Sequence, residues 1–173
     1  LSETRKPSTE MRKVVLPSTL KGIGPWAFEC CENLNEVEGE PELEWVGNDA
    51  FSETPFLYGV DSFEELDWEA AERGLGLRYI GNFAVGRYGW LEEIWDEGVD
   101  EAQWTYDLVI PEDTTGLADS IFVELPITSV TIPGGVKRIP NDAFGWNWLL
   151  KGLTIGEGVE EIGENAFAGV ALE

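Results

Sequence analysis

The sequence predicts an α/β solenoid of short stacked repeats, and two regularities in the chain support this prediction. A phenylalanine, usually preceded by alanine, recurs at intervals of 22 or 23 residues where copies adjoin. In four of the copies the phenylalanine also lies 12 residues after an apolar residue of a presumptive strand. A fixed period with a fixed internal spacing is typical of solenoids, in which each repeat packs only against its neighbours. The copies are marked by Phe28, Phe51, Phe122, Phe144 and Phe167.

Each repeat is expected to contain three short elements in a constant order. The tract Val130-Thr131-Ile132-Pro133 alternates apolar and polar residues, which predicts a strand with one buried face. Proline ends that strand because it has no N–H to give to a ladder. The pair Ile162-Gly163 indicates a second extended piece, and Ala166-Phe167 begins a short helical or 3₁₀ turn that places the ring in the core. We therefore expect short parallel strands on a concave face, with short helices or 3₁₀ turns opposite.

The repeat resembles that of a known family. Its pattern, I-P-x-x-V-x-x-I-G-x-x-A-F, is clearest in Ile132-Pro133, Val136, Ile139 and Ala143-Phe144. This pattern is similar to the BspA-type leucine-rich repeat, also called the Treponema pallidum type, and five copies cover roughly residues 13–57 and 106–173. The pattern has three departures: Gly39 replaces an apolar strand residue, Pro140 replaces glycine, and Ser120-Ile121 stands near the usual alanine. The resemblance implies a leucine-rich-repeat solenoid in a secreted or cell-surface protein that attaches to other proteins.

The repeats are interrupted between Phe51 and Phe122, which lie 71 residues apart. Either an insertion separates the copies, or two copies have lost their pattern, and we prefer the insertion. We accordingly expect a polar lead-in over residues 1–12 and a single leucine-rich-repeat domain over 13–173, with an inserted α+β segment at about 54–105.

Within the insertion the sequence predicts three elements. Ser62 and Glu65 have the spacing of a helix capping box, and Gly74 is a natural stop for that helix. The tract Leu77–Val85 is expected to be extended, with a turn at Gly81-Asn82. A second short helix is expected over Trp90–Gly98.

The composition excludes several classes of function. Eleven basic residues stand against 34 acidic ones, a net charge of −23, so a phosphate backbone or an anionic membrane would be repelled. No apolar run is long enough to insert into a membrane. The chain has no histidine, which excludes Ser-His-Asp and Cys-His catalysis. We expect no cofactor and no metal ion, and we expect Cys31 to be an inert buried thiol beside a more exposed Cys30.

Paired carboxylates are the remaining catalytic pattern, because glycoside hydrolases use two of them. Two groups of acidic residues raise the question, and we favour a solvated acidic face for both, since runs of charge usually face water. In the first group the residues alternate, which would put all five on one face of an extended segment. The groups are Glu36, Glu38, Glu40, Glu42 and Glu44, and then Glu92, Glu93, Asp96, Glu97, Asp100 and Glu101.

The strand positions that point outward predict a binding surface on the concave face. A short, chemically mixed row of this kind suits a polypeptide better than a small ligand, which prefers a deep pocket. These candidate residues are Lys13, Val15, Glu36, Glu38, Asp107, Val109, Ser129, Thr131 and Thr154. Exposed aromatic rings would form a second candidate platform, for a protein or a sugar, although we favour their covering the solenoid ends and the insertion. These rings are Trp90, Trp95, Trp104, Trp146 and Trp148.

Three functions follow, in order of preference. The first is a non-catalytic protein-binding or adhesion module, extracellular or on the cell surface as the resemblance implies, whose partner is a protein or a carbohydrate. The second is a structural spacer or scaffolding subunit of a larger assembly. The third and least favoured is an acidic-site glycoside hydrolase. We expect the chain to be a monomer.

Overall fold

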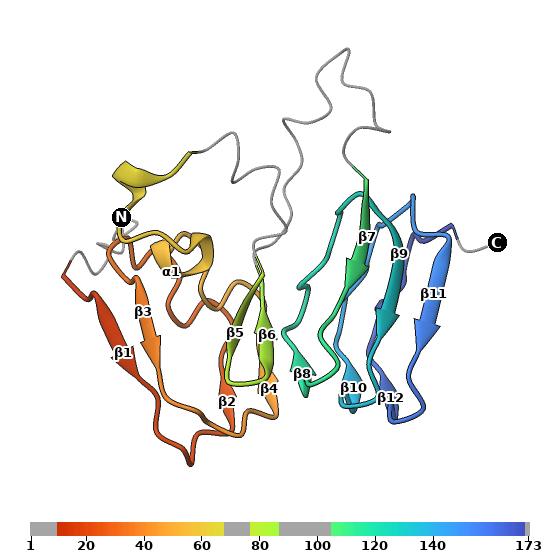
Figure 1. Cartoon of the computed structure of the whole chain (residues 1–173), viewed down its shortest axis with the longest axis horizontal. Coiled ribbons are helices and arrows are strands. Elements are labelled where there is room, and N and C mark those ends of the chain that lie inside the picture. The colour runs from red at the N-terminus through yellow and green to blue at the C-terminus, as the bar shows by residue number, and fades with distance from the viewer. Residues whose placement is uncertain (1–9, 68–76, 87–104, 172–173) are drawn as a thin grey trace, which may run out of the picture.

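The computed structural model describes residues 10–67, 77–86 and 105–171, and these form a solenoid of short, mostly parallel strands with little helix (Figure 1). The strands lie side by side along the long axis of the molecule in two rows. The first row contains β1 (Lys13–Val15), β3 (Glu36–Glu38), β7 (Tyr106–Val109), β9 (Ile127–Ile132) and β11 (Gly152–Ile155). The second row contains β2 (Gly22–Ile23), β4 (Trp45–Val46), β8 (Gly116–Leu117), β10 (Arg138–Ile139) and β12 (Glu161–Ile162). The predicted fold class is confirmed.

The strands pair in parallel at equivalent repeat positions. In the first row β1 pairs with β3, and β9 lies between β7 and β11, with one register shift next to Tyr106. In the second row β2 pairs with β4, and β10 pairs with β12. We call residues 10–54 the N-terminal array and residues 105–171 the C-terminal array. The sheet of the first row is thus divided into two parts, one in each array.

The third element of each repeat is a turn, where the sequence left open a short helix or a 3₁₀ turn. The residue two positions before each marker phenylalanine and the residue two positions after it have a left-handed backbone. Around Phe144 these are Asp142 (φ 52°) and Trp146 (φ 60°). Because left-handed residues alternate with others in the turn, successive N–H groups alternate in direction. One points back along the chain and the next points to the neighbouring repeat. The Phe144 N–H donates to the carbonyl of Ala166 at 2.8 Å, whereas the Gly145 N–H donates back to Asp142 at 3.1 Å. The turns therefore join neighbouring repeats directly, which a helix could not do.

The marker phenylalanines stack inside the molecule as two columns. Phe28 and Phe51 stack with ring centroids 5.0 Å apart in the N-terminal array. In the C-terminal array Phe144 lies 5.1 Å from Phe122 and 5.4 Å from Phe167. The first column ends against the tilted ring of Phe56, 5.3 Å from Phe51. The phenylalanine spacing thus predicted the core correctly, with the interruption dividing it.

The segment expected to be an insertion adds four short elements between the arrays. The single-turn helix α1 (Pro55–Tyr58) ends at Gly59, which has a left-handed backbone (φ 71°). The hairpin of β5 (Arg78–Ile80) and β6 (Phe83–Val85) turns at Gly81-Asn82, as the sequence predicts. β6 also pairs in parallel with β8, so it stands where a second-row strand of a preceding repeat would lie.

The predicted helix beginning at Ser62 is wrong for the residues that the structure describes. Only a 3₁₀ turn, η1 (Phe63–Glu65), forms, and the Ser62 side chain makes no capping bond. Leu66 has an extended backbone (φ −77°, ψ 120°), which ends the turn. Phe63 packs edge-on against Tyr58, with ring centroids 5.9 Å apart. Residues 68–76 and the helix expected over Trp90–Gly98 lie outside the described residues.

Within the described parts of the chain, none of the helices has the length and apolar character needed to cross a lipid bilayer.

Candidate binding surface

The strand register arranges the predicted concave residues in two lines across the first row. One line pairs Lys13 with Glu36 in the N-terminal array and runs from Asp107 through Ser129 to Gly152 in the C-terminal array. The other line follows two residues later in each strand. It pairs Val15 with Glu38, and runs from Val109 through Thr131 to Thr154. The structure therefore brings all the concave candidates together within each array.

In the N-terminal array the candidates form a compact ionic group. The Lys13 ammonium contacts the Glu36 carboxylate at 3.1 Å and also the Glu38 carboxylate. Hydrogen bonds to Glu38 and then to Glu36 raise the pKa of Lys13. All three side chains are well exposed, so water screens the attraction and the group adds little to stability. One lysine shared by two carboxylates leaves a net negative charge on this part of the surface.

In the C-terminal array a single carboxylate is held by hydroxyl groups. The Asp107 carboxylate accepts hydrogen bonds from Ser129 Oγ at 2.7 Å and from Thr128 Oγ1 at 2.8 Å. The bond from Ser129, followed by that from Thr128, lowers the pKa of Asp107. The rest of this surface consists of Val109, Thr131, Gly152 and Thr154, so Asp107 is the one charged residue among the candidates of this array.

Two exposed valines interrupt the polar lines. Val15 is 64% exposed and Val109 is 80% exposed, in equivalent strand positions of the two arrays. Single exposed apolar residues are common on protein surfaces. Here they share one line with hydroxyl and carboxylate groups, which gives the mixed chemistry usual at protein–protein contacts.

The structure describes two of the five candidate tryptophans, Trp146 and Trp148. Trp146 and Trp148 lie on the turn after Phe144 and are 58% and 36% exposed, so they are less covered than we expected. Trp146 has Gly169 of the last turn beneath it, where an added Cβ would lie 2.6 Å from the ring. Trp90, Trp95 and Trp104 lie outside the described residues.

Sequence reasoning missed two further exposed rings, Trp26 and Trp45, which are 51% and 50% exposed. Trp26 stands two residues before its phenylalanine, a turn position that faces outward in this repeat. Trp45 lies against Gly22 in the neighbouring strand, where a Cβ would come within 2.1 Å of the indole. The repeat position of each residue was the signal that could have found them.

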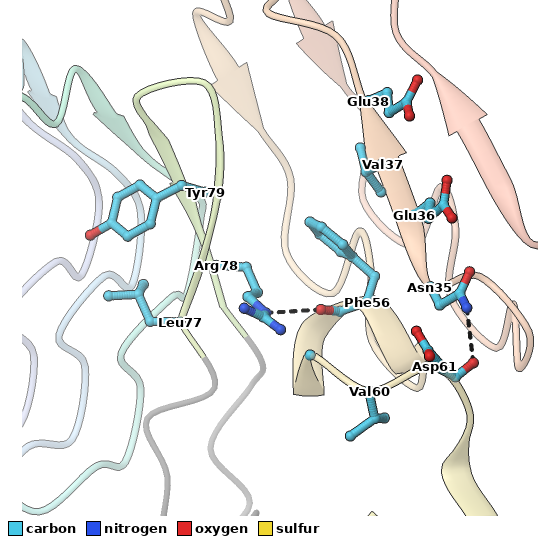
Figure 2. Close-up of a pocket in the computed structure, with 11 residues that line it drawn as sticks. Asn35, Glu36, Val37, Glu38, Phe56, Val60, Asp61, Leu77, Arg78 and Tyr79 are labelled. Carbon is cyan, nitrogen blue, oxygen red and sulfur yellow. Dashed lines mark hydrogen bonds between the residues drawn. The ribbon is translucent and has the colours of Figure 1, made fainter. Parts of the chain in front are cut away.

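A groove opens where the first row is interrupted, between β3 and β5 (Figure 2). Its volume is about 580 Å³, within the range of roughly 300–1,000 Å³ that is usual for ligand sites. We call it the edge groove; it is lined by Asn35–Glu38 of the β3 segment, by Phe56 and Gly59–Asp61 of the α1 loop, and by Leu77–Tyr79 of the β5 segment. It was not foreseen, because it arises from elements far apart in the sequence.

The expectation that five alternating glutamates share one face is wrong. Only Glu36 and Glu38 lie in β3, because the chain turns at Gly39, which has a φ of 105°. A side chain at Gly39 would meet the carbonyl of Leu16 at 2.2 Å. Glu42 and Glu44 instead surround Lys21, at 3.3 and 3.6 Å. The second acidic group, in residues 92–101, lies outside the described residues.

The two cysteines differ as the sequence predicts, with Cys31 buried and Cys30 partly exposed. Burial raises the pKa of the Cys31 thiol. The Cys30 thiol donates to the Glu53 carboxylate at 3.0 Å, and this bond, with burial second, raises its pKa to about 11. Both thiols are therefore protonated near neutral pH, which makes them weak nucleophiles. In the described ranges, no three Cys, Asp or Glu side chains gather as a metal site would require.

Comparison with known proteins now identifies the repeat. The chain matches the family described as the BspA type leucine-rich repeat region, in six copies over residues 6–66 and 102–173. This chain belongs to the BspA-type leucine-rich-repeat family. Its repeats are of a kind that generally mediates interactions between proteins. The family pattern contains one copy more than the five that the phenylalanines mark.

Among curated proteins, none matches this chain. A crystal structure of a leucine-rich repeat protein from Bacteroides ovatus is similar at 20% identity, with a TM-score of 0.32. The similarity covers 92% of this chain and 35% of that one, so this chain spans about a third of that protein's length.

Proposed function

We propose that this BspA-type repeat protein is a non-catalytic binding module that contacts a protein partner through the concave face of its first strand row. The observation that carries the proposal is the register of that row. It aligns Asp107 with Ser129, and Val109 with Thr131 and Thr154, in two lines of outward-facing side chains. The backbone of β9, at the centre of this row, is paired on both sides, so its side chains are what the surface offers to a partner there.

The chemistry of this surface favours a polypeptide. Hydroxyl groups and one carboxylate lie next to an exposed valine, so both polar and apolar groups of a partner would find contacts. The candidate side chains lie in lines across adjoining strands, whereas small molecules are usually bound in enclosed pockets. The chain's net charge of −23 favours partners that carry positive charge and speeds their approach.

Attachment to proteins outside the cell is the setting that we propose for this module. Membership of the BspA-type family supports an extracellular or surface location, and so adhesion. A carbohydrate partner remains the second form of the same proposal, supported by the exposed rings of Trp26, Trp45 and Trp146.

The test is to immobilise the full chain and expose it to purified extracellular-matrix proteins and to a surface extract, followed by affinity measurement for each protein retained. Thr131→Arg places a bulky cation at the centre of the proposed face and is expected to weaken binding at least tenfold. Thr19→Arg, on the exposed loop after β1, adds the same charge away from the face and should leave binding unchanged. Equal affinity of the unaltered chain, Thr131→Arg and Thr19→Arg would overturn the proposal that the concave face binds the partner. Retention of no partner would favour a structural spacer role.

A further inference from the structure

The edge of β3 that faces away from β1 lies at the interruption of the first row. β3 pairs with β1 on one side, where the Glu36 N–H donates to Arg12 at 3.1 Å and the Glu38 carbonyl accepts from Leu16 at 2.8 Å. Backbone groups alternate in direction along a strand, so the N–H and C=O of Val37 point away from β1. Across the described ranges no strand pairs with β3 on that side.

In the C-terminal array, β9 has a neighbouring strand on the side where β3 has none among the described residues. Val130 occupies the repeat position of Val37, and its side of β9 is closed by β11 in parallel register with Leu153. The edge of β3 instead borders the edge groove. Proteins usually cover or blunt such an edge, because it is a template for another extended chain.

The groove beside this edge has a volume of about 580 Å³ and a partly apolar wall. Figure 2 shows Phe56 between β3 and β5, with Arg78 pointing toward it and Leu77 and Tyr79 pointing to the other side of β5. Phe56 and Val60 are half-buried, so an incoming apolar side chain would find contacts there. β5 is itself the outer strand of its sheet, so the groove lies between two strands that each end a sheet.

The charges at the groove favour a basic occupant. Glu36, Glu38 and Asp61 border it, and Lys13 is already shared by the first two. The Arg78 guanidinium is committed as well, because its Nε donates to the Phe56 carbonyl at 3.0 Å and it packs on Gly59. The carboxylates of Glu36, Glu38 and Asp61 therefore outnumber the cations beside them and can pair with basic groups of a partner. A second copy of this chain, which would bring the same acidic edge and a net charge of −23, is disfavoured.

We propose that an extended polypeptide segment carrying lysine or arginine adds to the free edge of β3 as a further strand and lies in the edge groove. Its main chain would bond to the N–H and C=O of Val37, and its basic side chains would contact Glu36, Glu38 or Asp61. In strand addition of this kind, backbone bonds supply affinity and side chains supply specificity. The inference rests on the proposed protein-binding function and names a site for it.

The probes are three synthetic peptides of about seven residues, a length that spans roughly 23 Å when extended. The first alternates valine and lysine, the second replaces lysine with glutamate, and the third is the first with alternate backbone amides N-methylated. Binding to the full chain is measured by fluorescence anisotropy. The lysine peptide is expected to bind, with the glutamate and N-methylated peptides at least tenfold weaker and the affinity falling as salt rises.

Amide spectra of the labelled protein locate the binding. The lysine peptide should shift the Val37 and Gly39 amide signals and slow the hydrogen exchange of Val37, while Thr131 and Thr154 stay unchanged. The double variant Glu36→Lys/Glu38→Lys should lose at least tenfold in affinity. Glu157→Lys/Glu160→Lys, which makes the same change of charge in exposed residues of the last repeat, should not.

The outcomes separate this inference from the proposed function. Shifts confined to Thr131 and Thr154 would keep the concave binding face and overturn the edge site. Equal binding of the N-methylated peptide, or equal losses in both double variants, would overturn strand addition. Absence of binding by every peptide would overturn it too, as would sedimentation showing that a second copy fills the edge, and neither result would affect a partner bound at Thr131.

Discussion

The two arrays are built from the same repeat, yet they differ in how completely their cores are covered. In the C-terminal array the middle repeat has a neighbour on each side, and Ile132, Val136, Ile139 and Phe144 are all fully buried. In the N-terminal array Val14, Val37 and Phe28 are only partly buried. The strands differ too, since β9 has six residues and β1 and β3 have three each. Burial in a solenoid therefore depends on the neighbours a repeat has, more than on its own sequence.

The polar groups in the core show the same contrast. Asn147 lies fully buried three residues after Phe144, where its side chain accepts from the Leu125 N–H and donates to the Phe122 carbonyl, both at 2.8 Å. At the same repeat position in the N-terminal array, Thr54 makes one bond, to the Phe51 carbonyl at 2.6 Å. Asn147 thus links two repeats, whereas Thr54 bonds only within its own turn. We therefore expect the C-terminal array to be the more stable frame of the two.

The largest expected effect comes from the phenylalanine columns. Phe144→Ala removes a fully buried ring between two others and should lower the free energy of unfolding by about 3–5 kcal/mol. Phe28→Ala should cost clearly less, because that ring is partly exposed and stacks on one neighbour in the described core. Urea denaturation followed by circular dichroism measures both. An equal loss in the two variants would mean that the arrays are equally well packed.

The next effect compares the buried polar residues. Asn147→Ala leaves the Leu125 N–H and the Phe122 carbonyl without partners in the core and should cost about 1–3 kcal/mol. Thr54→Val keeps the shape and removes one hydrogen bond, so about 0.5–1.5 kcal/mol is expected. The same denaturation experiment reports both values. A larger loss for Thr54→Val would contradict the assignment of the C-terminal array as the frame.

The smallest expected effect is the contribution of the Cys30 thiol to stability, and the rate at which this thiol is alkylated measures its pKa. Since the pKa of Cys30 is raised from 9.0 to about 11, its contribution to stability is complete below pH 9 and is lost as the pH rises through about 11. Alkylation of Cys30 in the folded protein should therefore be slow at pH 8. Glu53→Gln removes the charged acceptor and should lower the apparent pKa and speed alkylation. Rates from mass spectrometry across pH test this, with buried Cys31 as the internal control; an unchanged profile in Glu53→Gln would refute the role of Glu53.

Much of the fold could be predicted because solenoid repeats are local. The spacing of Phe122, Phe144 and Phe167 implied that their rings stack, and the alternation in Val130-Thr131-Ile132 implied which side chain faces out. Cys31 and the hairpin turn at Gly81-Asn82 followed from the same kind of pattern. Within residues 62–67 the capping pattern at Ser62 produced only a 3₁₀ turn, since such a pattern is a local preference that the surrounding structure can override.

The outward strand positions of the candidate residues were predictable, whereas their role in binding a partner stays a prediction. Alternation along a strand predicted that Asp107, Val109 and Thr131 face outward, and the 71 residues between Phe51 and Phe122 predicted an interruption of the repeats. Neither pattern predicted that a groove opens at that interruption. The five glutamates appeared to share a face because alternation was extended through Gly39, where the backbone turns.

The sequence by itself determined the repeat, its period, the residues that stack and the strong negative charge, because each of these follows from spacing and composition. Only the tertiary structure decided that β6 takes a strand position beside β8, that strand pairing in the first row is interrupted after β3, and that a groove lies between β3 and β5. The physical reason is distance along the chain. Contacts within and between adjoining repeats produce a periodic pattern in the sequence. Val37, Phe56 and Arg78 line one groove only because packing brings together segments that no repeat relates.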